Sequence, residues 1–254
     1  MKFKFLFYTL SSIIFFFIFL PLLNIFMFPT ISNLINSIKD SEVVHALLLS
    51  LYSSILAAIL SVIFGTPIAY VFARKDFPFK KIIEGIVDLP IMIPHPVIGL
   101  AILSVVAKDY WIGKILNKLA IDVVGSVVGI VMVLTYVALP FYINSVKSGI
   151  KSIPERLEYV SRTLGKSQFE TFFKITIPLS LKSILEGIIM AMARAISEFG
   201  AVIIIAYHPM VAPVMIYERF TSYGLKYSMP VAVWLMLICL IFFIILRIVI
   251  NRRN

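Results

Sequence analysis

Six segments of this chain are apolar over about 20 residues, the length that a helix needs to cross a lipid bilayer. They cover approximately residues 5–28, 46–73, 84–106, 124–146, 183–206 and 230–250. Only helices and closed barrels satisfy their own backbone groups in hydrocarbon, and long unbroken apolar runs favour helices. The charged fraction is 14%, compared with about 25% in soluble domains, which also indicates a membrane protein. We therefore expect an all-α polytopic membrane protein with residues 1–254 in one transmembrane domain.

The basic residues indicate which way the segments run. If the N-terminus is inside, sixteen of the 23 Lys and Arg residues lie on the inner side, six lie on the outer side, and Arg194 lies within a segment. Positive charge gathers on the cytoplasmic side of membrane proteins. We therefore expect both termini on the cytoplasmic side of the cell membrane. The net charge of +10 reflects this bias rather than a surface for nucleic acid.

One long polar segment, residues 147–182, interrupts the apolar pattern on the expected inner side. Ser152 and Glu155 have the spacing of a capping box, which predicts the start of a helix with Pro154 in its first turn. This helix is expected to run to Leu164. The apolar side chains that share one of its faces are Leu157, Val160 and Leu164.

A turn and a second helix are predicted to follow. Gly165 provides a C-terminal stop, because glycine adopts the left-handed conformation cheaply. Ser167 and Glu170 have capping-box spacing as well, and Pro178 is expected to limit the helix that they start. The segment is thus predicted to be an amphipathic helix–turn–helix lying at the membrane surface. An ordinary surface connector fits this pattern as well as a docking element for a soluble partner does.

The spacing inside this segment resembles a known family. Gly165 is followed, after nine residues, by Ile175-Thr176-Ile177-Pro178, which resembles the E-A-A-x3-G-x9-I-x-L-P loop of ABC importer permeases. Tyr159-Val160-Ser161 replaces E-A-A, and Glu158 stands one position early. In that family the loop docks into a groove on the ATPase subunit. The positions to which the resemblance assigns ATPase coupling are Glu158, Arg162, Gly165, Ile175 and Pro178.

The third apolar segment carries three prolines within nine residues, from Asp88 to Pro96. Each proline removes a backbone donor and disfavours a straight helix. Non-helical backbone at membrane depth is tolerated only against protein or a water-filled cavity. A kink here suits a gate or hinge, although helix packing alone also explains it. The candidates for the gate are Asp88, Pro90, Pro94, His95 and Pro96.

The fifth apolar segment contains ionisable groups near its middle. Arg194 and Glu198 are one turn apart, and with Ser197 they fall on a stripe that we expect to face the interior. An ionised group at the bilayer centre costs about 2.5–3.5 kcal/mol on insertion scales. The stripe either lines a translocation path, with Arg194 largely neutralised by Glu198, or holds helices together through a local i,i+4 pair.

Longer blocks extend the resemblance over most of the chain. Gly85–Leu103, Arg162–Gly165 and Ala193–Phe220 closely resemble the molybdate/tungstate ABC transporter permease family. Sulfate permeases are close relatives of that family. The resemblance implies the type I ABC importer permease architecture with six transmembrane helices. It also implies that the cargo is a tetrahedral oxyanion, with sulfate as the alternative to molybdate or tungstate.

The same resemblance implies partners. The importer would contain two identical permeases and two cytoplasmic ABC ATPases, and an extracellular oxyanion-binding protein would deliver the cargo. The outer loops, above all Tyr207–Met229, would receive that protein. ATP and Mg²⁺ would be used by the ATPase, and this chain would bind no cofactor and no nucleic acid.

Other functional classes fit less well. An ATP-independent channel or secondary transporter would need no partner-facing helix pair. An intramembrane enzyme would need a nucleophile with a base, or metal-spaced ligands, and the spans contain neither, so no catalytic or metal-binding residue is assigned. Gly165-Lys166-Ser167 is not a phosphate-binding loop, because Val160 occupies the position of its first glycine. Cys239 is expected to be an inert buried thiol. A purely structural subunit would leave the prolines and the charged fifth segment unexplained.

Overall fold

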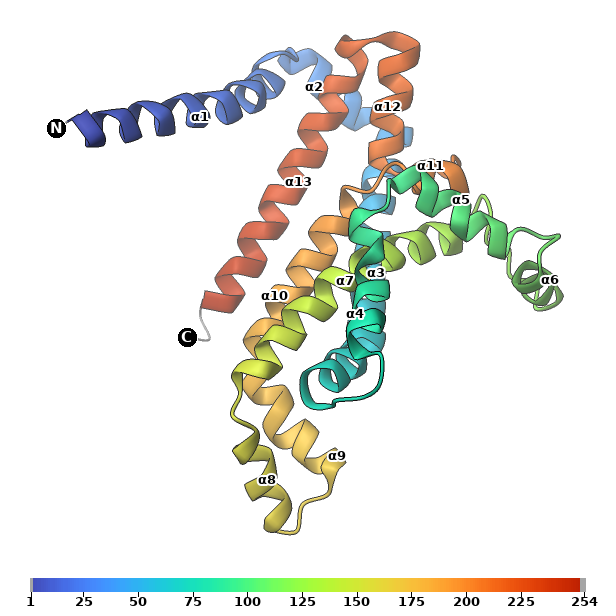
Figure 1. The fold of residues 1–254 in the computed structure, drawn as a ribbon. Coiled ribbons are helices and arrows are strands. Elements are labelled where there is room, and N and C mark those ends of the chain that lie inside the picture. Colours follow the sequence, from blue (N-terminus) through green and yellow to red (C-terminus); the bar gives the residue numbers. More distant parts are fainter. Residues whose placement is uncertain (1, 252–254) are drawn as a thin grey trace.

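The computed structural model describes residues 2–251 and is all-helical over that range (Figure 1). This confirms the expected all-α class. Arg252 and Arg253, which the charge argument places inside, lie outside the described residues. The helices are α1 (Lys2–Met27), α2 (Ile31–Lys39), α3 (Ser41–Arg74), α4 (Lys80–Met92), α5 (His95–Val106), α6 (Trp111–Lys118), α7 (Val127–Ser152), α8 (Glu155–Thr163), α9 (Gln168–Thr171), the π-helical segment η1 (Phe172–Thr176), α10 (Ile177–Ile196), α11 (Val202–Ile205), α12 (Ala212–Tyr223) and α13 (Leu225–Asn251).

Helices α3, α7 and α10 form the centre of the molecule. Tyr142 of α7 is fully buried between the other two. A methyl group added to Gly65 of α3 would lie 2.6 Å from the Tyr142 ring, and one added to Gly187 of α10 would lie 3.0 Å from it. The Tyr142 hydroxyl shares a hydrogen bond of 2.7 Å with Thr66 Oγ1. Small residues let membrane helices approach closely, so the two glycines set how closely α3 and α10 flank α7.

Five of the described helices, α1, α3, α7, α10 with its preceding turns, and α13, are long and apolar enough to cross a membrane. The count reaches the predicted six if the bent pair α4–α5 forms one span. The boundaries shift most around the polar segment. Because α7 continues to Ser152 and α10 already begins at Ile177, the non-spanning connection is shorter than the predicted 147–182.

Two of the predicted spans are broken. Helices α4 and α5 meet at an angle of 114°, which confirms the break that the prolines predict. The expected fifth span, 183–206, is wrong as a continuous helix, because α10 ends at Ile196 and a turn leads to the short α11. In that turn Glu198 accepts a hydrogen bond of 2.9 Å from the Ala201 N–H. A side-chain acceptor thus replaces a helical carbonyl, which a count of apolar residues does not reveal.

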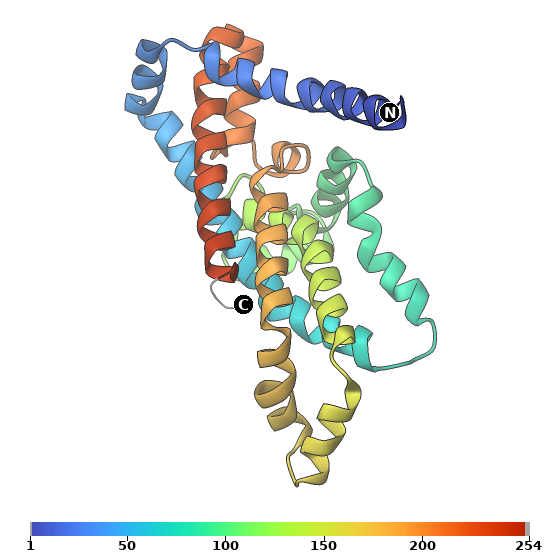
Figure 2. The ribbon, with the colours of Figure 1, turned by 90° about the vertical axis from the view of Figure 1, so that its left-hand side faces the viewer.

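Helix α1 leaves the bundle at the end opposite α8 and α9, and both views show it running across the long direction of the other helices (Figures 1 and 2). None of the 18-residue window that defines it as a candidate span is buried. A helix that is apolar on all sides is stable only inside lipid or against protein. Little within this chain therefore fixes the angle of α1.

The end of the bundle opposite α8 has its own small core, where α2, α3, α12 and α13 meet. Asp40 caps α3 by accepting from the Glu42 N–H at 2.9 Å, and it also accepts from Arg219 Nη2 of α12 at 2.6 Å. The hydrogen bond from Arg219 is the main cause that lowers the pKa of Asp40. A second link joins Ser50 Oγ of α3 to the Ala212 N–H at 2.7 Å, so α12 is fastened to α3 at two points.

Candidate functional site

Helix α8, the turn after it and helix α9 form a hairpin that projects beyond the bundle (Figures 1 and 2). We call this hairpin, residues 155–171, the arm. It is continuous with α10 through η1 and is joined to α7 through a short connection. The predicted helix–turn–helix is thus confirmed, and its position at the membrane surface stays a prediction. Its root, where it joins the bundle, carries buried polar groups that bond to the end of α3.

The first predicted capping box does not form. Ser152 is the last residue of α7, and its hydroxyl donates back to the Gly149 carbonyl at 2.7 Å. Pro154 becomes the N-cap of α8, and no side chain caps that helix. The prediction failed because α7 runs farther than the apolar segment suggests, so the serine hydroxyl is already used by its own helix.

Gly165 ends α8 in the left-handed conformation, with a φ of 81°. The Lys166 N–H bonds to the Ser161 carbonyl at 3.2 Å, and the Gly165 N–H bonds to the Arg162 carbonyl at 3.0 Å. These two bonds are the signature of the Schellman motif. No atom lies within 4 Å of a Cβ added to Gly165, so the glycine is required by its backbone conformation and not by crowding.

The second predicted capping box is confirmed. Ser167 Oγ accepts from the Glu170 N–H at 3.1 Å, and Glu170 Oε2 accepts from the Ser167 N–H at 3.2 Å. Lys166 and Lys174 also approach Glu170 Oε1, at 3.4 and 3.2 Å. The backbone hydrogen bond from Ser167, followed by the two lysines, lowers the pKa of Glu170 to about 2.

Pro178 does not limit the second helix, which corrects the prediction. The helix passes through η1, where the Ile177 N–H bonds to the Phe172 carbonyl, and continues into α10. A π-helical turn closes its bonds over five residues instead of four. Pro178 falls in the first turn of α10, where its missing N–H is tolerated beside that wider turn.

The arm turns its polar side inward. The expected apolar face is exposed, and Glu158 and Ser161 are the buried residues of α8. Arg162 is exposed, Ile175 is half-buried and Pro178 is exposed. The large apolar side chains that the arm and η1 expose are Leu157, Tyr159, Val160, Leu164, Phe169 and Phe173. We call this set the arm surface.

The carboxylate of Glu158 is the centre of the arm's root. Its Oε1 accepts from Arg74 Nε at 2.9 Å and from Thr176 Oγ1 at 3.0 Å, and its Oε2 accepts from Tyr70 OH at 3.1 Å. Arg74 Nη2 donates in turn to the Ile153 carbonyl at 2.9 Å. The side chains of Arg74 and Glu158 are only 5% and 10% exposed. This is a buried ion pair whose lone pairs and N–H groups are largely satisfied.

Sequence reasoning missed Arg74, Tyr70 and Thr176 as part of this site. Arg74 was read only as one charge of the inner side, and Thr176 only as a spacer in the motif. Both lie far from Glu158 along the chain, 84 and 18 residues away, and helical periodicity does not connect separate elements. The available signal was an arginine at the very end of an apolar helix, together with a glutamate on a helix that lacks a buried apolar face.

The two broken spans meet at a second polar cluster. His95 begins α5, Arg194 lies in the last turn of α10, and Glu198 follows α10. Glu198 Oε2 contacts both Arg194 Nη2 and His95 Nδ1, the latter at 3.0 Å. Arg194 Nη2 also lies 2.8 Å from His95 Nε2. The Glu198 side chain is fully buried, whereas those of Arg194 and His95 are 16% and 38% exposed.

The remaining candidates of the third span lie on both sides of its break, and Pro94 and Pro96 adjoin His95 of this cluster. Asp88 accepts a hydrogen bond of 2.6 Å from Asn144 Nδ2 of α7. Pro90 is buried within α4, and Pro94 and Pro96 flank the start of α5. A Cβ on Gly200 would lie 3.0 Å from His95 Cβ and 3.1 Å from Pro96 Cδ. The proline-rich break therefore seats directly against the turn that ends α10.

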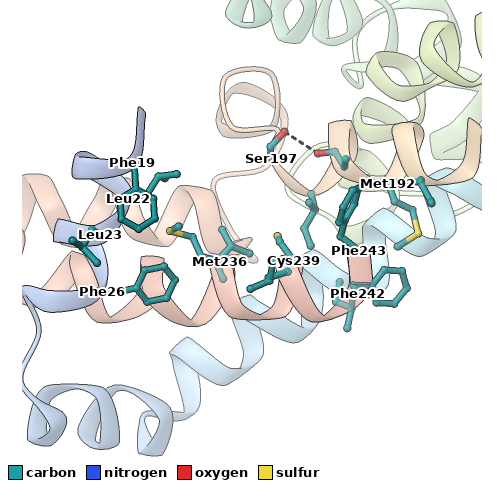
Figure 3. A pocket seen from close by; sticks show the side chains of 16 residues that line it. Phe19, Leu22, Leu23, Phe26, Met192, Ser197, Met236, Cys239, Phe242 and Phe243 are labelled. Carbon is teal, nitrogen blue, oxygen red and sulfur yellow. Dashed lines mark hydrogen bonds between the residues drawn. The ribbon is translucent and has the colours of Figure 1, made fainter. Parts of the chain in front are cut away.

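Ser197 does not join Arg194 and Glu198 on one stripe, which corrects that prediction. It is exposed, and its hydroxyl donates to the Ala193 carbonyl at 3.0 Å. Ser197 lines a cleft of about 920 Å³ between α1, α10 and α13, where Cys239 also lies (Figure 3). The other lining residues are apolar, so the cleft offers a dianion no charged partner. Among residues 2–251, no group of three or more His, Cys, Asp or Glu side chains could hold a metal ion.

The chain is similar to known proteins over most of its length. Residues 61–254 match the family described as "Binding-protein-dependent transport system inner membrane component". The chain is 44% identical over 234 residues to the molybdate/tungstate transport system permease protein of Methanocaldococcus jannaschii, covering 92% of this chain and 91% of that one. For the corresponding protein of Pyrococcus abyssi the identity is 40%, covering 98% and 96%.

More distant relatives include a sulfate permease and permeases of known structure. A probable sulfate transport system permease protein of Nephroselmis olivacea is 29% identical, covering 83% of this chain and 76% of that one. Among solved structures, a bacterial ABC transporter that imports alginate superposes with a TM-score of 0.72 over 99% of this chain and 96% of its own, at 16% identity. That likeness concerns the fold alone.

Proposed function

This chain belongs to the inner-membrane components of binding-protein-dependent transport systems, and from that premise we propose that it moves a tetrahedral oxyanion, molybdate or tungstate, across the membrane in an ATP-driven importer. It is a multi-pass protein of the cytoplasmic membrane and a permease subunit of the ABC importer class. The identity of the cargo follows the relatives at 44% and 40% identity.

The arm is the observation that carries the ATP-driven mechanism. It projects from the bundle, and its outer surface is apolar although no other part of residues 2–251 covers it. Exposed apolar patches with polar surroundings mark sites of protein contact, and the basic residues Arg156, Arg162 and Lys166 are exposed on the same arm. We infer that the arm surface docks onto a separate ATPase chain, which binds the ATP and Mg²⁺. The arm then lies inside the cell, as the charge bias also indicates.

The two broken spans are our proposed pathway element. Transporter binding sites form where discontinuous helices meet near the membrane midplane, and His95, Arg194 and Glu198 stand at such a meeting point. Glu198 neutralises Arg194, so a passing dianion meets a weak site that it can leave again. Helix α4 packs mainly on α7 within this chain, and a second permease would complete the path. An outer binding protein would deliver the cargo near α12.

Uptake measurements test the proposal. Cells or vesicles that carry this chain with its ATPase and binding protein are expected to take up labelled tungstate only when ATP is hydrolysed. Unlabelled molybdate is expected to compete at equal concentration, and sulfate only in large excess. Uptake that continues without ATP hydrolysis would show a channel or secondary transporter instead. Equal competition by sulfate would favour the second candidate cargo, which the sulfate permease relative suggests.

A simpler test concerns the arm alone. An ATPase chain is expected to co-purify with the wild-type protein and to be lost when Leu164, which is 78% exposed at the turn, is replaced by aspartate. Leu119 is 63% exposed at the end of α6, outside the candidate spans and away from the arm. Leu119→Asp is therefore the matched control and is expected to retain the ATPase. Retention of the ATPase by the Leu164 variant would show that the ATPase does not dock on the arm surface.

A further inference from the structure

We propose that helix α3 acts as a rod that links the arm to α12 at the opposite end of the molecule, with the Arg74–Glu158 pair as its inner joint and the Asp40–Arg219 pair as its outer joint. In this inference, which rests on the proposed function, Glu158 is a positioning residue. It transmits the movement of a docked arm and does not itself touch the ATPase.

The inner joint gathers three elements on one carboxylate. Glu158 belongs to α8, Arg74 and Tyr70 to the last turns of α3, and Thr176 to η1. Two carboxylate oxygens thus take three donors, and a second hydrogen bond ties Arg74 to the Ile153 carbonyl before α8. Hydrogen bonds to charged groups are stronger and shorter than neutral ones. The arm therefore cannot tilt without moving the end of α3 or losing these bonds.

Burial separates Glu158 from the docking surface. The residue is 8% exposed, whereas its neighbours Leu157 and Tyr159 are 44% and 57% exposed. A soluble partner that covers the arm surface reaches those neighbours but not the carboxylate. The hydroxyls of Ser161 and Thr171, 3.0 Å apart, close the same inner side between α8 and α9. The arm thus has an apolar outer surface for contact and a polar inner side for attachment.

Helix α3 is suited to carry the movement. It continues through 34 residues, which at 1.5 Å per residue is about 51 Å, and it passes Pro67, which lies near the inner joint and lacks the N–H for one helical bond. It packs on α7 and α10, and Gly65 lies against Tyr142 in its last third. The helix is continuous between the two joints, so its two ends are linked through one element. A tilt imposed at Arg74 therefore appears at Asp40.

The outer joint repeats the arrangement in smaller form. Asp40 caps the first turn of α3 and accepts from Arg219 of α12. Ser50, two to three turns farther along α3, accepts from the first N–H of α12. Helix α12 thus follows the end of α3 through one ion pair and one hydrogen bond. A contact made by an outer binding protein on α12 and an ATPase contact on the arm would then bias the same helix, which is the physical requirement for coupling between sites.

The test measures coupling separately from docking. The wild-type chain with its co-purifying ATPase is placed in proteoliposomes, and ATP hydrolysis is measured with and without the oxyanion-binding protein loaded with tungstate. The stimulation ratio is the readout. Glu158→Ala is expected to keep the ATPase bound and to lower this ratio about tenfold. Exchanging the charges, Arg74→Glu with Glu158→Arg, is expected to restore part of it.

Matched controls exist at both joints. Glu155 lies 4.0 Å from Arg74 and its side chain is half exposed, and Glu42 is exposed in the first turn of α3. Glu155→Gln and Glu42→Gln are expected to leave the ratio unchanged. Asp40→Ala is expected to lower the ratio several-fold, although it lies at the far end from the arm. If an alanine variant fails to accumulate, Glu158→Gln and Asp40→Asn remove the charge alone and decide the same question.

Several outcomes overturn the rod. An unchanged stimulation ratio in the Glu158 variants does so. Loss of the ATPase from Glu158→Ala, without recovery in the charge exchange, would show that Glu158 contacts the ATPase directly. A normal ratio in Asp40→Ala and Asp40→Asn would remove the outer joint. If the wild-type chain binds no ATPase, the proposed function itself fails, and that result is distinguishable because it requires no variant.

Discussion

Two glutamates, Glu158 in the arm and Glu198 between the broken spans, use the same chemistry in different surroundings. Both are buried, at 8% and 1% exposure, and both accept from an arginine. The partners of Glu158 come from α3 and η1: the Arg74 side chain is 5% exposed, Thr176 is buried and Tyr70 is half-buried. Those of Glu198 are an arginine four residues away and a histidine that is partly exposed.

The difference indicates different tasks. A sealed carboxylate with distant partners fastens elements together, because removing it leaves a charge that water cannot reach. A carboxylate whose arginine and histidine partners remain partly exposed balances their charge but leaves them accessible to solvent and to an anion. On this view Glu158 serves attachment of the arm, and Glu198 adjusts how strongly the path attracts an anion. Two experiments separate these tasks, and two more test the turn of the arm and the outer joint.

The largest effect is expected for Glu158→Ala. The change leaves Arg74, whose side chain is 5% exposed, as an uncompensated buried charge, which costs about 3–5 kcal/mol of unfolding free energy. Denaturant unfolding in detergent measures this cost. Glu155→Ala, on the exposed side of the same helix, is expected to change the unfolding free energy by less than about 0.5 kcal/mol. Equal losses for the two variants would contradict the sealed joint.

A smaller loss of stability, about 1–3 kcal/mol, is expected for Glu198→Gln, because Arg194 and His95 keep access to solvent. The effect on transport is expected to be distinctive. An arginine without its counter-charge holds the dianion more tightly, so the half-saturation concentration for tungstate uptake and the maximal rate should both fall. Ser197→Ala is the control and should change neither. Unaltered uptake kinetics in Glu198→Gln would show that this pair only holds helices together.

Next in size is the effect of adding a methyl group at the arm's turn. Gly165→Ala forces a left-handed conformation on a residue with a Cβ, at about 1–2 kcal/mol. Gly85 of α4 is equally open to a new Cβ but has an ordinary helical conformation, so Gly85→Ala should stabilise by about 0.5–1 kcal/mol. Hydrogen exchange of the arm amides distinguishes them, because only the Gly165 variant should open the arm.

The smallest effect is expected at the outer joint and depends on pH. The hydrogen bond from Arg219 lowers the pKa of Asp40, so its contribution to stability is present above the unfolded pKa of about 3.9 and is lost as pH falls through the lower folded pKa. The thermal midpoint of Asp40→Asn should lie slightly below that of wild type at pH 7. The gap should close below about pH 4. A gap that does not depend on pH would mean that the carboxylate charge is not what matters there.

Much of the fold could be predicted because it rests on local sequence. Long apolar runs located the five helices that are long and apolar enough to cross a membrane, and three prolines located the break between α4 and α5. Gly165 and the Ser167–Glu170 pair also behave as predicted, since capping depends on neighbours within a few residues.

The errors arise where the ends of helices or partners from other elements decide what a side chain does. Ser152 lost its predicted role because α7 extends to it and its hydroxyl bonds to the Gly149 carbonyl. Helix α8 buries Glu158 rather than Leu157 and Leu164 because Arg74 and Thr176, which bond to the Glu158 carboxylate, lie on its inner side. Ser197 faces the apolar cleft because α10 ends one residue before it. Periodicity describes one helix at a time, so it cannot supply these partners.

The wide turn at η1 determines which side chains of the helix leading out of the arm point toward α8. Thr171 bonds to Ser161, and Thr176, five residues later, bonds to Glu158. In a regular α-helix two side chains five residues apart point about 140° away from each other, and only one threonine could then face α8. The extra residue in the π-helical turn restores the phase, so both face it. Deleting one residue from this turn would rotate the arm about its own axis relative to α10, and the two threonines could then no longer both face α8.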